Sequence, residues 1–140
     1  MTEFKPSDWP VLVTGAGGFV GGHIAPRLAT AGRPVVGLTR KPPRVEPGDP
    51  TIDWFIGDLR DLACRREALR GVRGVVHAAG WVSLGADRSG DSAAVNVDAT
   101  RALIADAAAA GVERFVYTST LHTVAAGSID RPADEETPWN

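Results

Sequence analysis

The chain has 140 residues, of which 44% are hydrophobic and 23% are charged, and its formal net charge is -2. This composition is typical of a globular domain with a buried core, so we expect a single domain over residues 1–140. The weak negative charge gives no reason to expect nucleic acid or an anionic membrane as a partner. Cys64 is the single cysteine, which excludes an intramolecular disulfide and a structural zinc cluster.

The N-terminal stretch lacks the basic and apolar regions of a signal peptide. No apolar run approaches the length of a transmembrane helix. We therefore expect a cytoplasmic protein in which residues 1–9 form an unstructured leader.

From residue 11 onwards, the predicted elements alternate between strands and helices. Short apolar runs predict strands over residues 11–14, 34–39, 52–56, 74–78 and 114–118. Helical patterns cover residues 20–31, 61–70 and 92–110, and Asp61 is the expected N-cap of the second helix. Pro26 lies inside the first helical pattern, where it predicts a kink or a differently placed first turn. Four prolines between residues 40 and 50 predict a surface loop.

This alternation predicts an α/β protein with a Rossmann-like, doubly wound parallel sheet. Right-handed crossovers give five strands in the order 3-2-1-4-5, with helices on both faces. All five strands then end at one edge of the sheet, which is where ligands bind in such folds. The residues that follow each strand are therefore the candidates for a functional site.

A glycine-rich turn follows the first strand. Gly15, Gly18 and Gly21 fit the spacing G-x-x-G-x-x-G, and a helical pattern begins at Val20. A helix N-terminus presents unpaired N–H groups and the positive end of its dipole to an anion, and glycines let that anion come close. The turn therefore predicts a phosphate site.

The second strand is followed by Arg40 and Lys41. They lie roughly 20 residues past the glycines, where an NAD site would carry an acidic residue for the ribose 2′-hydroxyl. Two cations suit a 2′-phosphate instead, so the sequence favours NADP(H) over NAD(H). The other interpretation is a solvated basic loop.

Polar or small residues also follow the remaining strands. Asp58 either accepts a hydrogen bond from an adenine amino group or caps the next turn. His77 is expected to be structural rather than catalytic. Room for a flat ring system is predicted at Ala78, Ala79 and Gly80. A row of hydroxyls, where nicotinamide and substrate would meet, consists of Thr118, Ser119 and Thr120.

Five segments occur together in order along the chain: TGAGGFVGGHI at 14–24, GDL at 57–59, HAAG at 77–80, NVDAT at 96–100 and RFVYTST at 114–120. Together they resemble the extended short-chain dehydrogenase/reductase superfamily, the NAD-dependent epimerase/dehydratase group. Its members include sugar epimerases, dihydroflavonol reductases and 3β-hydroxysteroid dehydrogenases. The acidic, proline-containing segment at 134–139 is similar to the one that follows the fifth strand in many members.

The resemblance implies a role for each matching residue. Backbone N–H groups around Gly17, Gly18, Phe19 and Val20 would hold the pyrophosphate, and Asp58 with Leu59 would frame the adenine. Asn96 would brace its helix against the fourth strand, and Thr120 would be the catalytic hydroxyl that bonds the substrate. The complete set of implied cofactor-binding residues is Gly15, Gly17, Gly18, Phe19, Val20, Gly21, Arg40, Lys41, Asp58, Leu59, Ala78, Ala79, Gly80, Asn96, Thr118 and Ser119.

The family's catalytic tyrosine and lysine, spaced YxxxK on the helix after the fifth strand, have no counterpart in these 140 residues. Tyr117 is the only tyrosine and lies inside the fifth predicted strand, and no lysine follows Lys41. His122 could donate a proton, but nothing in the sequence places it. Because a positioned general acid–base contributes typically 10²–10⁴-fold, we expect no turnover from this chain alone. Small-molecule substrate would bind only in a full-length form that includes a substrate lobe.

The leading interpretation is the cofactor-binding portion of an oxidoreductase, epimerase or dehydratase. A full-length relative would transfer hydride between nicotinamide and a carbonyl or secondary alcohol. The main alternative is a non-catalytic NADP(H)-binding sensor or partner module, and a third is a flavin or nucleoside-diphosphate binder on the same fold.

The helical pattern at 92–110 predicts two faces. A core face is expected to carry Val97, Thr100, Leu103 and Ile104. A smooth opposite flank of alanines is expected at Ala94, Ala102, Ala105 and Ala109, with Asp98. Either alanine is simply a good helix former here, or the flank packs against a further helix, a second copy or a complementing subunit.

Overall fold

The computed structural model describes residues 9–82, 89–120 and 127–138. Its elements, in chain order, are β1 (Val11–Thr14), α1 (Phe19–Thr30), β2 (Val35–Thr39), β3 (Asp53–Ile56), α2 (Leu62–Ala68), β4 (Gly74–His77), the π-helical segment η2 (Ala93–Ala99), α3 (Thr100–Ala109) and β5 (Arg114–Tyr117). Residues 127–138 form hydrogen-bonded turns of their own. The predicted leader lies outside the described residues except for its last one, Trp9.

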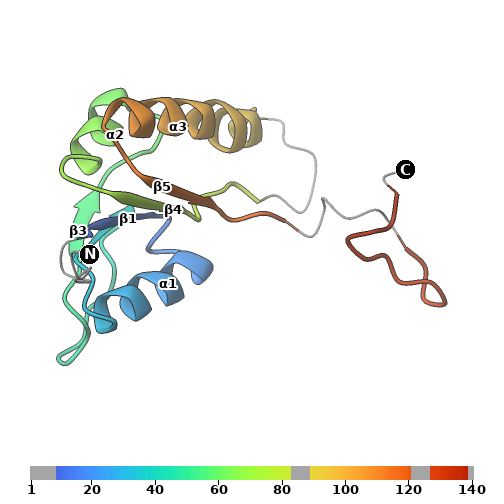
Figure 1. Ribbon diagram of the computed structural model, residues 1–140, viewed down its shortest axis with the longest axis horizontal. Coiled ribbons are helices and arrows are strands. Elements are labelled where there is room, and N and C mark those ends of the chain that lie inside the picture. Colours follow the sequence, from blue (N-terminus) through green and yellow to red (C-terminus); the bar gives the residue numbers. More distant parts are fainter. Residues whose placement is uncertain (1–8, 83–88, 121–126, 139–140) are drawn as a thin grey trace, which may run out of the picture.

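The five strands form one parallel sheet in the order β3-β2-β1-β4-β5, which confirms the predicted topology (Figure 1). Thr14 at the end of β1 pairs with Leu38 of β2 and His77 of β4, and His77 in turn pairs with Tyr117 of β5. The carboxyl ends of the strands are therefore level with one another, so the residues that follow them converge on one edge.

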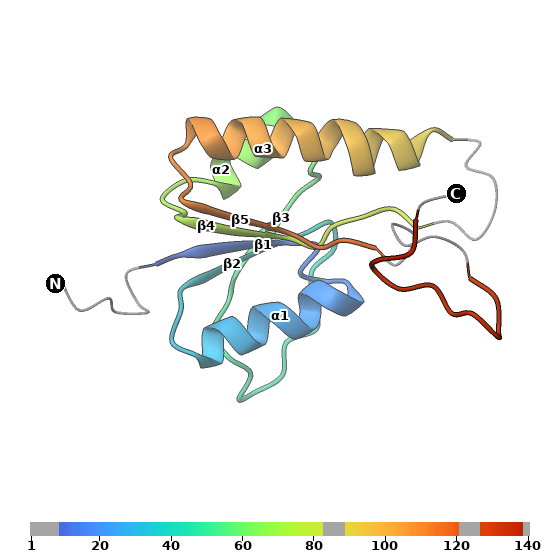
Figure 2. The same ribbon diagram turned by 45° about the vertical axis from the view of Figure 1, so that its right-hand side comes forward.

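Helices cover both faces of the sheet, as predicted. α1 lies on one face, and α2 and α3 lie on the other (Figure 2). Side chains alternate along β1, so Leu12 enters the core under α2 and α3 while Val11 and Val13 enter the core beside α1. Leu12 and Val13 are both fully buried, which makes β1 the centre of the molecule.

Local signals place the helix ends. Asp61 caps α2, because its carboxylate accepts hydrogen bonds from the N–H groups of Ala63 and Cys64 at 2.7 and 3.1 Å. α1 begins at Phe19, one residue before the predicted start, with Gly18 as its N-cap. Pro26 is accommodated inside α1, which runs on to Thr30.

The predicted helix at 92–110 differs from the observed one. Its first half is the π-helical segment η2, and only the second half, α3, is α-helical. The placement of Val97 and Ile104 on the core face is wrong, because they are 42% and 48% exposed. Thr100 and Leu103 are buried as predicted, and Ala99 and Ala107 share their face. A π-helix bonds residue i to i+5, so the 3.6-residue period cannot be extended across both segments.

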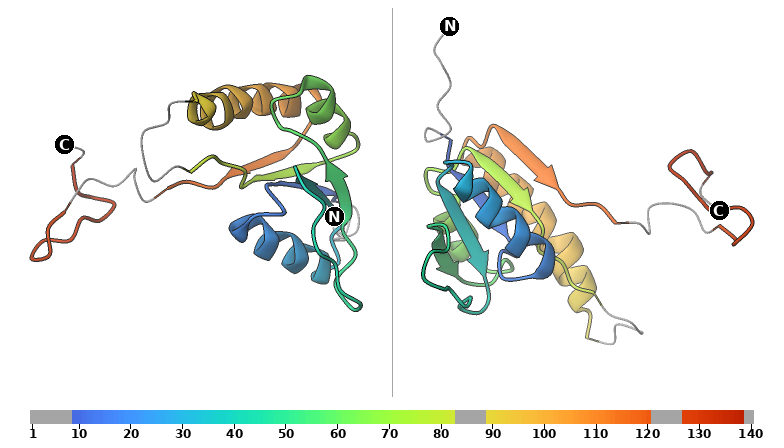
Figure 3. Two further views of the ribbon diagram at one scale, coloured as in Figure 1. Left: turned by 180° about the vertical axis from the view of Figure 1, so that it is seen from behind. Right: turned by 90° about the horizontal axis from the view of Figure 1, so that it is seen from below.

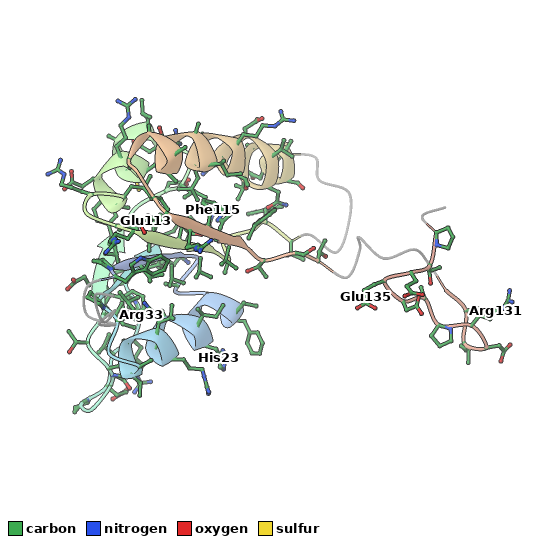
Figure 4. The ribbon with its side chains drawn as sticks, in the orientation of Figure 1. His23, Arg33, Glu113, Phe115, Arg131 and Glu135 are labelled. Carbon is green, nitrogen blue, oxygen red and sulfur yellow. The ribbon has the colours of Figure 1, made fainter. Side chains whose placement is uncertain are left out.

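β5 forms an edge of the sheet, and within the described residues only β4 pairs with it (Figure 3). Large apolar side chains are exposed on η2, α3 and β5, namely Val97, Ile104, Val116 and Tyr117. Phe115 lies on the side of β5 that faces α3 and packs against the core there (Figure 4). Unpaired strand edges and exposed apolar side chains both favour association.

We expect the 140-residue chain, produced by itself, to self-associate. Light scattering at increasing concentration should give a mass that rises above that of the monomer. Ile104→Lys should lower this mass because it places a charge among the exposed apolar side chains. Val45→Lys is the matched control, since Val45 is an exposed valine in the loop after β2. A monomeric mass at every concentration would contradict this expectation.

Candidate functional site

A cleft of about 340 Å³ lies at the carboxyl ends of the strands. The ends of β1, β2, β3 and β4 and the start of α1 converge on it. Its lining residues are Thr14, Gly15, Gly17, Gly18, Leu38, Thr39, Arg40, Lys41, Gly57, Asp58, Leu59, Ala78, Ala79, Gly80, Trp81 and Val95. The structure thus brings together the predicted residues of four strand ends, from the glycine turn to the segment after β4.

The glycine turn is packed so closely that side chains are excluded from it. Gly15 has φ +68, and a Cβ there would lie 2.8 Å from the backbone of Ala79. A Cβ at Gly17 would collide with the side chain of Thr39, and one at Gly21 would collide with the backbone of Gly15. Gly21 therefore lets α1 approach the turn and does not itself line the cleft. The glycines bring three chain segments into backbone contact.

The first turn of α1 supplies the free N–H groups of the site. The N–H of Gly18 donates to Gly15 O at 2.8 Å, and the N–H of Gly22 donates to Gly18 O at 2.9 Å. The N–H groups of Phe19 and Val20 lie between these two bonds, among the first-turn donors without a helical acceptor. Their side chains are exposed and do not line the cleft. Gly18 thus contributes open space at the site, since its own N–H closes the turn.

A hydrogen-bonded chain lies behind the cleft. Fully buried His77 has Thr14 Oγ1 at 2.6 Å from its Nδ1 and Thr100 Oγ1 at 2.9 Å from its Nε2. Thr14 Oγ1 also accepts from Ala79 N–H at 3.2 Å, and Thr100 Oγ1 donates to Val95 O at 3.5 Å, so the neutral imidazole carries its proton on Nε2 and accepts at Nδ1 from Thr14. The imidazole then donates through Nε2 to Thr100. Burial lowers the pKa of His77 to about 4, so it is neutral at pH 7.

Asp58 holds its carboxylate at the rim through Arg60. The Arg60 guanidinium bonds Asp58 Oδ2 at 2.7 Å and reaches Asp91, before η2, at 3.1 Å. The hydrogen bond from Arg60 keeps the pKa of Asp58 below its usual range, with a smaller contribution from the charge of Arg40. Asp58 is thus ionised at neutral pH and can accept hydrogen bonds. In the described part of the chain, Arg40 and Lys41 make no ion pair.

Asn96 lies outside the lining of the cleft but holds one of its walls. Its Oδ1 accepts from Trp81 N–H at 2.7 Å, and its Nδ2 donates to Trp81 O at 2.9 Å. This amide clamp attaches η2 to the segment that follows β4. Trp81 and Val95 also line the cleft, although no sequence pattern predicted them there. The position of Trp81 directly after HAAG was the available signal.

The hydroxyl row lies beyond the cleft. Thr118 N–H donates to His77 O at 3.0 Å, which extends the pairing of β5 with β4 past the end of the strand. Thr118, Ser119 and Thr120 are exposed and do not line the cleft. Tyr117 stacks on His77, with ring centroids 5.1 Å apart. His122 lies outside the described residues.

The described residues contain neither a candidate metal centre nor a candidate membrane-spanning helix. In residues 9–82, 89–120 and 127–138, no group of three or more His, Cys, Asp or Glu side chains is placed to hold a metal ion. None of the helices in these ranges has the length and apolar character needed to cross a membrane.

The sheet order, the glycine turn and the cleft at the strand ends define a Rossmann-type nucleotide-binding fold. The model of the NAD dependent epimerase/dehydratase family matches residues 11–140. The chain therefore belongs to this family, as its motifs predicted.

Individual relatives agree with this assignment. The chain is 35% identical over 135 residues to a 3 beta-hydroxysteroid dehydrogenase/Delta 5-->4-isomerase of Mycobacterium tuberculosis, covering 92% of this chain and 36% of that protein. It is 38% identical over 117 residues to sterol demethylase protein B of Methylococcus capsulatus, covering 81% and 35%. The chain thus spans about a third of the length of these curated relatives.

Solved structures show the same fold. A short-chain dehydrogenase/reductase superfamily protein from Agrobacterium tumefaciens with bound NAD has a TM-score of 0.70 and 36% identity, over 79% of this chain and 32% of that one. MoeE5, in complex with UDP-glucose and NAD, has a TM-score of 0.73 and 31% identity, over 93% and 44%.

His77 makes the stability of the protein dependent on pH. The unfolded chain binds a proton at the ordinary pKa of 6.5, whereas the folded chain binds it only at about pH 4. The contribution of His77 is therefore complete above pH 6.5 and is lost as the pH falls toward 4. From pH 7 to pH 4.5 the wild type should lose roughly 2 kcal/mol more than His77→Asn, whose amide does not titrate. Urea unfolding at both pH values measures this, and equal losses would contradict it.

Proposed function

We propose that the cleft binds a nicotinamide dinucleotide and that the chain is the cofactor-binding portion of an NAD(P)-dependent oxidoreductase, epimerase or dehydratase. The glycine turn carries this proposal. Gly15 lets the turn meet the backbone at the end of β4, Gly17 leaves room for the Thr39 side chain and Gly21 lets α1 approach the turn, while the first-turn N–H groups of α1 remain available to an anion. A pyrophosphate fits this donor set. Two related structures contain bound NAD, which supports the choice of cofactor.

The other lining residues suit the remaining parts of the cofactor. The N–H groups of Phe19 and Val20 would hold the pyrophosphate, and the small residues Ala78–Gly80 would leave room for the rings. Asp58, ionised and held at the rim, would accept a hydrogen bond from the adenine amino group. Leu59 would complete the adenine pocket.

Arg40 and Lys41 support NADP(H) as the preferred cofactor. Both line the cleft at the end of β2, and neither is used in an ion pair within the described residues. An unpaired arginine can bond a 2′-phosphate bidentately, and Asp58 adds only one negative charge nearby.

The reaction of a full-length protein would be hydride transfer, which the bound nicotinamide supplies or accepts. Thr118, Ser119 and Thr120 follow β5 past the level of the cleft, and Thr120 would bond the substrate carbonyl or hydroxyl. Tyr117 is unsuited to be the general acid, because its ring is stacked on His77 at the edge of the sheet and does not line the cleft. A general acid–base must therefore come from residues other than Tyr117.

The phosphate preference is tested by titrating NADP+ and NAD+ into the protein. NADP+ should bind more tightly, and Arg40→Ala should weaken NADP+ about tenfold or more while leaving NAD+ nearly unchanged. Arg44→Ala is the matched control, because Arg44 lies in the same loop but is paired with Glu46 in solvent. Equal affinities for both dinucleotides would exclude the assignment of a 2′-phosphate site.

The pyrophosphate position is tested with Gly18→Val. A Cβ at Gly18 would meet only Gly15 O among the described atoms, at 3.2 Å, so the side chain is expected to fill the cleft with little effect on folding. Both dinucleotides should lose binding while the melting temperature stays near that of the wild type. Gly22→Ala, on the same helix and outside the lining, should bind normally. Retained binding by Gly18→Val would place the cofactor elsewhere.

A further inference from the structure

Arg65 is a buried arginine in α2, below the segment that carries Asp58. Its side chain is 7% exposed, and its Nε donates to Asp106 Oδ2 of α3 at 2.6 Å. Its Nη1 donates to two carbonyl oxygens, Leu59 O at 2.8 Å and Arg60 O at 3.0 Å. Buried charges are retained when they are paired and hydrogen-bonded, and here every bond runs between α3, α2 and the segment after β3.

The peptide unit between Leu59 and Arg60 is held from both of its sides. Arg65 Nη1 donates to the carbonyl oxygen of this peptide unit, Leu59 O. The N–H of the same unit, on Arg60, donates to Asp58 Oδ1 at 2.9 Å. A peptide unit is planar, so its C=O and N–H turn together. The orientation that Arg65 imposes on the carbonyl therefore also fixes where the N–H holds the Asp58 carboxylate.

We propose that Arg65 and Asp106 are positioning residues for base recognition, which they achieve by setting the orientation of the Leu59–Arg60 peptide and, through it, the Asp58 carboxylate. This inference rests on the proposed function, in which Asp58 accepts a hydrogen bond from the adenine amino group. Asp106 neutralises the buried guanidinium and aims it, and Arg65 transmits that position to the rim of the cleft. Neither side chain lines the cleft.

The Arg60 guanidinium also holds the Asp58 carboxylate, with Nε donating to both oxygens at 3.1 and 3.2 Å and Nη2 donating to Oδ2 at 2.7 Å, but it is a weaker constraint. The Arg60 side chain that bonds the carboxylate is 45% exposed, and exposed ion pairs contribute little. The buried set below the peptide has two carbonyl acceptors and a carboxylate around one guanidinium, a geometry that lysine cannot reproduce. Loss of the buried set should therefore loosen the carboxylate even though Arg60 is kept.

The preference for adenine over hypoxanthine can be measured as a ratio of two affinities, and a general change in the stability of the protein does not alter this ratio. The probes are NADP+ and nicotinamide hypoxanthine dinucleotide phosphate, in which an oxygen replaces the adenine amino group and faces the carboxylate. The wild type should prefer adenine by about tenfold or more, because a hydrogen bond to a charged acceptor is lost in the analogue. The ratio of the two affinities, measured on one sample, is independent of the folded fraction.

The decisive variant is the double substitution Arg65→Met with Asp106→Leu. Replacing both members of a buried ion pair with apolar residues often preserves stability, whereas removing one member does not. The double variant should stay folded and bind the dinucleotides, but its preference for adenine should fall to about threefold or less. Arg65→Lys keeps the charge without the fork of donors and should also lower the preference. Arg70→Met, at an exposed arginine that pairs with Glu67 and not with Asp106, should keep the wild-type ratio.

The outcomes separate this inference from the proposed function. Asp58→Asn should abolish the preference, because an amide can face either base. If the wild type binds neither dinucleotide, or if Asp58→Asn leaves the preference intact, the proposed function fails at this site. If Asp58→Asn abolishes the preference while the double variant and Arg65→Lys both keep it, the positioning role of Arg65 and Asp106 is overturned. If the double variant does not fold, the ratio for Arg65→Lys decides alone.

Discussion

The close approach of the β1 end to the β4 end is the constraint on which the rest of the structure depends. Gly15 has a positive φ and lies so near the Ala79 backbone that no side chain fits between them. The same contact is bridged by Thr14, whose hydroxyl accepts from Ala79 N–H and donates to His77. Because β1 is buried on both faces, any displacement at this point would disturb both cores.

Further contacts connect this point to the strands on either side of β1 and β4. Toward β2 and β3, Gly17 packs on Thr39, and the segment carrying Asp58 is held by Arg65 from below. Toward β5, His77 bonds Thr100 at the start of α3 and stacks on Tyr117. The cleft is thus bounded by strand ends whose positions are set by buried contacts, while Arg40 and Lys41 at its rim are exposed. A cleft of this kind can bind a charged ligand with little change in the protein conformation.

Much of the fold and part of the site were predictable because their signals are local. The strand at Val11–Thr14, the N-cap at Asp61 and the glycine turn each depend on a few adjacent residues. The contact of Arg65 with Asp106 joins residues far apart in the sequence, so no local pattern predicts it, and the bracing role of Asn96 was implied only by the resemblance of NVDAT to the family motif. The prediction that Val97 lies on the core face is wrong for another reason, because it assumed a uniform α-helical period where the backbone is π-helical.

The π-helical segment carries a consequence for how this protein can vary. η2 leads without a break into α3, so Asn96 and Leu103 belong to one continuous helical rod with two different pitches. Tightening η2 to an α-helix with all seven residues kept would rotate Asn96 relative to the buried face of α3, because successive residues of an α-helix are about 100° apart and those of a π-helix are closer in angle. Leu103 could stay in the core only if Asn96 turned away from Trp81. Loss of one residue together with this tightening would bring Asn96 back to nearly the same angle, so the π-helical segment can be exchanged for an α-helix that is one residue shorter without breaking either contact.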